Sequence, residues 1–84
     1  MQAIRIKGGA IFVYDGTFTV RLSPDGECDT SPITYRTLEW DLRTEPENRW
    51  EYLTEGDLVN LPDNGYEKIL KAFGYIKEVL GPNV

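Results

Sequence analysis

Alternating apolar and polar residues in the first quarter of the chain predict three short β-strands. We expect them at residues 3–7, 10–14 and 17–22, where β-branched and aromatic residues are frequent. Gly8-Gly9 and Asp15-Gly16 separate these runs, and such pairs accept the positive φ angles of tight hairpin turns. With two-residue turns, one face of this antiparallel meander carries Ile4, Ile6, Ile11, Val13, Phe18, Val20 and Leu22. The Gly-Gly pair also suits a β-bulge, which leaves the first register open.

The other face of the meander carries a mixture of basic and aromatic side chains. Rings can stack on bases and cations can contact phosphates, which predicts a candidate surface for single-stranded nucleic acid. Its residues are Arg5, Lys7, Phe12, Tyr14 and Arg21. The structural alternative is that aromatic residues simply suit a pleated surface. The net charge of −5 opposes binding to a polyanion.

Negative charge is concentrated in the middle of the chain. Residues 22–63 hold eleven acidic residues and only three arginines. The first acidic group falls in Ser23–Pro32, which is rich in residues that favour turns. We expect a surface loop that carries Asp25, Glu27 and Asp29.

A second alternating pattern begins at residue 33 and predicts a hairpin. Its apolar side carries Leu38, Trp40 and Leu42, and the returning strand is expected at Arg49–Leu53. A five-residue loop, Thr44–Asn48, keeps the apolar residues of both strands on one face. The outward face and the tip of this acidic hairpin then carry Glu39, Asp41, Glu45, Glu47 and Glu51.

The last part of the chain has helical periodicity. An apolar stripe begins at Tyr66 and ends before Gly81-Pro82; it consists of Tyr66, Ile69, Leu70, Phe73, Ile76 and Leu80. Beside it, Ala72, Tyr75 and Val79 form a second stripe, which either packs under the sheet edge or forms a surface for a dimer or another partner. Gly74 in the middle of the helix would permit close packing. The preceding segment, Leu53–Leu61, is ambiguous, and its second half, Asp57–Leu61, fits a strand or a single helical turn.

These elements predict a single α+β domain over residues 1–84. An antiparallel sheet of four to five strands, formed by the meander and the acidic hairpin, is expected to pack against one C-terminal α-helix. The alternative is a half-open, SH3-like barrel.

Several kinds of chemistry are excluded by composition. Without histidine the chain has no catalytic triad with an imidazole base, and it has no glycine-rich phosphate loop. Cys28 is the only cysteine, so neither an intramolecular disulfide nor a usual zinc site can form. We expect no enzymatic activity, no cofactor, no metal and no small-molecule substrate. The absence of a long apolar run and of a signal-peptide pattern predicts a cytoplasmic protein without a membrane anchor.

The charge pattern predicts a small acidic module for protein–protein interaction. Its partner is expected to be a basic, nucleic-acid-handling protein that it inhibits or regulates, because an acidic surface steers association with such a protein. In composition, though not in any motif, the chain is similar to small phage-encoded inhibitors such as anti-CRISPR proteins. The alternatives are direct binding of single-stranded nucleic acid, and a structural or assembly subunit that forms a homodimer through the second helical stripe.

Overall fold

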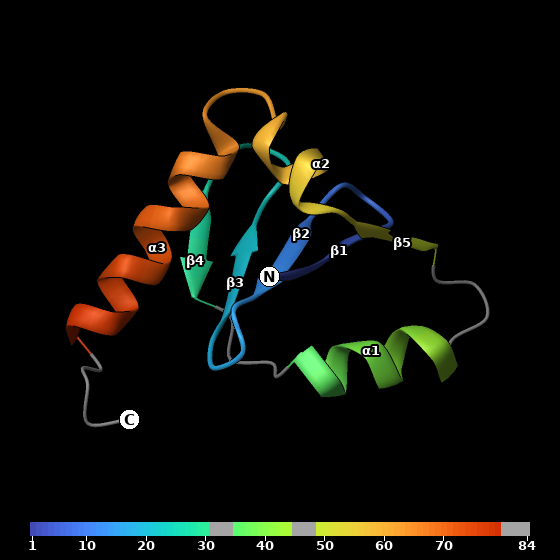
Figure 1. Cartoon of the computed structure of the whole chain (residues 1–84). Coiled ribbons are helices and arrows are strands. Elements are labelled where there is room, and N and C mark those ends of the chain that lie inside the picture. The colour runs from blue at the N-terminus through green and yellow to red at the C-terminus, as the bar shows by residue number, and fades with distance from the viewer. Residues whose placement is uncertain (31–34, 45–48, 80–84) are drawn as a thin grey trace.

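The computed structural model describes residues 1–30, 35–44 and 49–79. Within these ranges an open sheet lies between one helix on one side and two helices on the other (Figure 1). In chain order the elements are β1 (Gln2–Ile6), β2 (Ile11–Tyr14), β3 (Thr19–Leu22), β4 (Cys28–Thr30), α1 (Tyr35–Thr44), β5 (Trp50–Leu53), α2 (Glu55–Val59) and α3 (Gly65–Val79).

The five strands form one antiparallel sheet in the order β4-β3-β2-β1-β5. This confirms the expected α+β fold, in which an antiparallel sheet packs against the C-terminal helix α3. The SH3-like barrel is wrong, because β4 and β5 lie at opposite edges of an open sheet. Within the described residues, β4 and β5 each have one edge that no further strand pairs with.

The larger core lies between the sheet and α3. Helix α3 presents Ile69, Phe73 and Ile76 to the sheet at the spacing expected for one helical face. Leu58 of α2 is fully buried in the same cluster. From the strands the cluster takes Ala3, Ile11, Val13, Val20 and Leu22. Leu70, expected in this core, is 41% exposed, and Leu80 lies outside the described residues.

A smaller core lies on the opposite face of the sheet, under α1 (Figure 1). Leu38 and Leu42, four residues apart on α1, are both buried there. They pack with Ile4, Ala10 and Phe12 of the first two strands and their connection. The domain thus has two apolar layers, whereas the sequence predicted one.

The first hairpin differs from the expected register by one residue. Ile6 N–H donates to the Ala10 carbonyl at 2.9 Å, which closes a loop of three residues in place of two. As a result Ile4 lies opposite Phe12, where a two-residue turn would have set it opposite Val13. Because side chains alternate between the faces of a strand, a slip of one residue moves Ile4 and Ile6 to the α1 side.

The second hairpin also differs from expectation, but its faces are unchanged. Val13 pairs with Val20, and the connection is longer than the expected Asp15-Gly16 turn. The Asp15 carboxylate accepts hydrogen bonds from the N–H groups of Thr17 and Phe18, both at 2.8 Å, and so closes the longer turn. A shift of two residues keeps every side chain on its expected face.

The prediction of an acidic hairpin is wrong. Residues 38–42 belong to α1, and β5, the expected second strand, pairs with β1 in place of residues 38–42. Trp40, assigned to the core, is 68% exposed. Leu38 and Leu42 are buried as expected, but by a helix on the other side of the sheet from α3.

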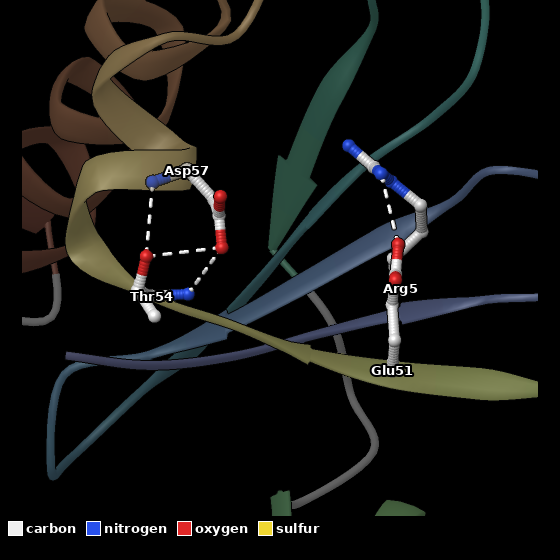
Figure 2. A network of polar contacts seen from close by, with 4 residues as sticks. All are labelled: Arg5, Glu51, Thr54 and Asp57. Atoms are coloured by element: carbon white, nitrogen blue, oxygen red, sulfur yellow. Dashed lines mark hydrogen bonds and ion pairs between the residues drawn. The ribbon is translucent and has the colours of Figure 1, made fainter.

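Two connecting segments contain regular structure that the sequence left open or missed. Part of the expected loop at 23–32 is a tight turn followed by β4. The ambiguous segment before α3 is helix α2, which begins with a capping box (Figure 2). Thr54 Oγ1 accepts from the Asp57 N–H at 3.2 Å, and Thr54 N–H donates to Asp57 Oδ2 at 2.8 Å. This cap seats Leu58 in the core.

Candidate interaction surface on α1 and β5

Helix α1 exposes its largest side chain. Leu38 and Leu42 face the sheet, and Trp40 lies between them in sequence. Because each residue turns the helix by about 100°, a residue two positions away lies on the far side. The indole of Trp40 therefore points away from the core, with 68% of the residue exposed. Full burial of an indole would contribute roughly 2–3 kcal/mol to the stability of the fold, and Trp40 does not make this contribution.

Strand β5 adds a second exposed ring beside α1. Tyr52 is 53% exposed, and its ring meets Trp50 edge-to-face, with centroids 4.8 Å apart at 87°. Trp50 is half-buried and packs against the smaller core. The pair thus combines a partly buried anchor with an exposed phenol ring.

A polar network joins α1 to β5. Arg43 Nη2 donates to Glu39 Oε2 at 3.3 Å and to Tyr52 Oη at 3.1 Å. Tyr52 Oη donates to the same Glu39 oxygen at 3.5 Å. Such an exposed ion pair stabilises a helix by only a few tenths of a kcal/mol, so its clearer effect is to orient the tyrosine.

We define the α1–β5 surface by Glu39, Trp40, Arg43, Trp50 and Tyr52. Tryptophan, tyrosine and arginine are the residues most enriched at the energetic centres of protein interfaces. The sequence prediction placed Glu39 at a contact surface, but it assigned both Trp40 and Tyr52 to an apolar face that does not form. The spacing of four between Leu38 and Leu42, repeated by Glu39 and Arg43, is compatible with this helix, but it fits a strand equally well.

The acidic residues expected on the hairpin and in the preceding loop lie in different parts of the molecule. Glu39 and Asp41 are on α1, and Glu51 is on β5. Asp25 and Glu27 lie in the turn between β3 and β4, and Asp29 is in β4, opposite Arg21. Glu45 and Glu47 lie outside the described residues. The structure therefore divides the described acids among three places.

Glu51 points to the side of the sheet that faces α2, where its carboxylate pairs with Arg5 at 3.0 Å (Figure 2). The two residues are directly opposite in the ladder between β1 and β5. Both side chains are substantially exposed, so this pair contributes little free energy. It lies on the other face of the sheet from Trp50 and Tyr52, so Glu51 is not part of the α1–β5 surface.

Two of the exposed carboxylates take part in local backbone structure. The side-chain hydrogen bond from Ser23, followed by the backbone of Glu27, lowers the pKa of Asp25. The backbone N–H and then the side chain of Thr54 lower the pKa of Asp57. Asp25 stabilises a turn and Asp57 stabilises a helix cap. These local hydrogen bonds give each carboxylate a structural role within the domain.

The expected basic-aromatic face is not formed as a stacking platform. Phe12 is only 7% exposed and lies in the core under α1. Tyr14 is half-buried, and its hydroxyl donates to the Gly16 carbonyl at 2.7 Å. Arg5 lies on the opposite face, Arg21 is half-buried, and Lys7 is exposed in the first turn.

The second stripe of α3 is partly exposed. Tyr75 is 64% and Val79 60% exposed, whereas Ala72 is half-buried and packs against the larger core. Gly74 is exposed, and a Cβ at this position would meet nothing within 4 Å, so the glycine does not serve close packing.

Two features of the described residues bear on metal binding and on the reactivity of the thiol. They contain no group of three or more potential metal ligands. Cys28 is half-buried, and burial followed by the charge of Asp29 raises the pKa of its thiol, which disfavours the nucleophilic thiolate. None of the described helices combines the length and apolar character needed to cross a membrane.

Comparisons with known proteins found no protein family, no curated protein and no solved structure that matches this chain. The chemistry and placement of its own residues are therefore the basis for a functional proposal.

Proposed function

We propose that this protein is a protein-interaction module that binds its partner through the α1–β5 surface. The observation that carries this proposal is the 68% exposure of Trp40 on the outer side of a helix whose two leucines are buried. Packing against a partner would recover the hydrophobic contribution that the fold leaves unused. Tyr52, held by Arg43 and Glu39, provides a second contact whose orientation is set before binding.

The partner that the charge of the molecule favours is a basic protein. The net charge of −5 attracts such a partner over distance, and Asp41 lies exposed on the same helix as Trp40. A basic partner that handles nucleic acid would be inhibited or regulated if this domain covered its nucleic-acid contact. The arginine and aromatic residues would then provide affinity, and the surrounding acids would increase the association rate.

The decisive experiment compares the wild-type protein with Trp40→Ala in affinity capture from cells, followed by mass spectrometry. We expect Trp40→Ala to lose the partner while its thermal unfolding stays close to wild type, because the indole is exposed. Val59→Ala is the control, since Val59 is an apolar residue of similar exposure on α2. Retention of the partner by Trp40→Ala, or its loss with Val59→Ala alone, would contradict the proposal.

Purified partner then tests the two finer parts of the proposal. Trp50→Phe leaves Trp40 as the only indole, so its fluorescence should shift to shorter wavelength on binding. If the partner is basic, the association rate should fall as the salt concentration is raised. A rate that does not depend on salt would exclude a basic partner. Inhibition is tested by adding this protein to the partner's complex with nucleic acid, which it should displace.

A further inference from the structure

A groove of about 470 Å³ lies between strand β4 and helix α3, away from the α1–β5 surface. Cys28, Asp29 and Thr30 line it from the strand. Lys68, Lys71 and Tyr75 line it from the helix. Figure 1 shows α3 running beside β4, which is the last strand on that side of the sheet. The groove therefore combines a sheet edge with one side of a helix.

The outer edge of β4 presents backbone groups to this groove. Ser23 N–H donates to the Glu27 carbonyl at 2.7 Å, which marks these residues as a hydrogen-bonded pair of the antiparallel ladder. Because such pairs alternate, the N–H and C=O groups of Cys28 and Thr30 point away from β3. Within the described parts of the chain no strand pairs with that edge.

Charges of opposite sign lie on the two sides of the β4 edge. Lys68 and Lys71 stand on the α3 side, where Lys68 Nζ also donates to the Gly26 carbonyl at 3.0 Å. Asp29 alternates with Cys28 and Thr30 along the strand, so its side chain lies on the other face, opposite Arg21. A strand added here would meet Lys68 and Lys71 on one face. On the other face its neighbour in the sheet would be Asp29, with Arg21 one strand further in.

We propose that the β4 edge accepts an extended segment of a partner protein, paired to Cys28 and Thr30 as an additional strand. The segment carries acidic side chains at alternate positions, directed to Lys68 and Lys71, and a basic side chain on its other face beside Asp29. Main-chain hydrogen bonds provide the attachment, and the charge alternation provides the selectivity. A second copy of this chain fits less well, because pairing about a two-fold axis at Asp29 places two Asp29 side chains together.

The direct test uses a short capped peptide that alternates glutamate with threonine and has a central lysine at one threonine position. Titrated into the isotope-labelled full chain, it should produce saturable shifts of amide resonances in β4 and α3, with α1 unmoved. The charge-reversed peptide has the same backbone capacity and should bind about tenfold more weakly or worse.

Variants of the protein separate backbone pairing from charge. Thr30→Pro removes an N–H that points outward and is expected to abolish binding, whereas Thr30→Ala keeps the N–H and the binding. Lys71→Glu should weaken binding of the acidic peptide about tenfold. Lys7→Glu makes the same charge change at an exposed residue of the first turn and should leave the affinity unchanged. Each variant must unfold thermally at a temperature close to that of the wild type. If Thr30→Pro fails to fold, the binding result for Lys71→Glu decides whether the proposal holds.

Cys28 supplies an independent readout in the unmodified protein. It is the only cysteine and it lines the groove, so an occupant should slow its alkylation by iodoacetamide. Equal binding of the two peptides, or shifts confined to α1, would overturn the proposal. A dimer in sedimentation experiments that Thr30→Pro abolishes would show that a second copy is the occupant, and would overturn it as well.

Discussion

The two faces of the sheet carry apolar layers of very different size. On one face, α3 and α2 cover a cluster of nine buried residues that extends across three strands. On the other face, α1 covers a cluster that contains five buried residues among those described, with Leu38 and Leu42 from the helix. The larger layer buries Ile69, Phe73 and Ile76 of α3, although Tyr75 of the same helix is exposed. The smaller layer leaves Trp40 of α1 exposed.

This difference predicts that the two layers differ in stability and that the proposed binding surface lies on the less stable one. A helix of ten residues is marginal by itself, and α1 has only two buried leucines to hold it to the sheet. It should therefore open at a lower free energy than α3, as surfaces used for binding commonly do. The α3 layer, in contrast, should set the free energy of global unfolding.

The largest expected effect comes from truncating the centre of the α3 layer. Phe73 is 4% exposed, and Phe73→Ala should lower the free energy of unfolding by about 3–5 kcal/mol, measured by urea denaturation. For a domain of this size that is a large share of roughly 4–12 kcal/mol in total. A loss below about 1 kcal/mol would show that α3 does not set global stability.

A smaller and more local effect is expected in the α1 layer. Leu42→Ala should cost about 2 kcal/mol, at the low end for a buried leucine, because few neighbours surround it. Amide hydrogen exchange should accelerate in α1 and stay near wild type in the first half of α3. Uniform acceleration throughout the chain would mean that the two layers unfold as one unit.

The cap of α2 tests whether that short helix belongs to the α3 layer. Thr54→Ala removes the N-cap and should cost about 1 kcal/mol by denaturation. The pKa of Asp57 is held below its ordinary value of 3.8, so its ionised form stabilises the fold at neutral pH. That contribution is present above this value and is lost as pH falls through the lower folded pKa.

The stability difference between wild type and Asp57→Asn should therefore shrink in acid, below pH 3.8. Exchange in α1 should not respond to either change at the cap. If the difference between wild type and Asp57→Asn were independent of pH, the carboxylate would not be part of the cap in solution.

The smallest expected effect is a gain. Gly74 lies exposed in the middle of α3 with open space at its Cβ position, so Gly74→Ala should raise stability by up to about 1 kcal/mol. Thermal unfolding measures the gain, and exchange in the larger layer should slow more than exchange in α1. A loss of stability would indicate a helix distortion at this position that alanine does not accept.

Much of the fold was accessible from the sequence because its signals are local. The stripe of Ile69, Phe73 and Ile76 identified α3 and its buried face, since only a helix places those spacings together. Strands β1 to β3 and β5 were found from alternation and turn residues. The candidate site was not, because Trp40 was assigned to a core on the basis of a period of two.

The sequence by itself determined which segments are strands or helices wherever the spacing of apolar residues fits only one of the two periods, two for a strand or about 3.6 for a helix. Residues 38–42 fit both periods, because Leu38 and Leu42 share a face in a strand and in a helix, and only Trp40 distinguishes the two. Tertiary structure decided in favour of the helix. Because β5 pairs with β1, and because Ile4 and Ile6 lie on the α1 side of the sheet, the two leucines have an apolar surface to cover. Ile4 and Ile6 lie on that side because the loop at Gly8-Gly9 has one residue more than expected, and a loop residue changes the face of a side chain only through the pairing of the strands. The exposed Trp40 is thus a product of tertiary packing, and no local pattern specifies it.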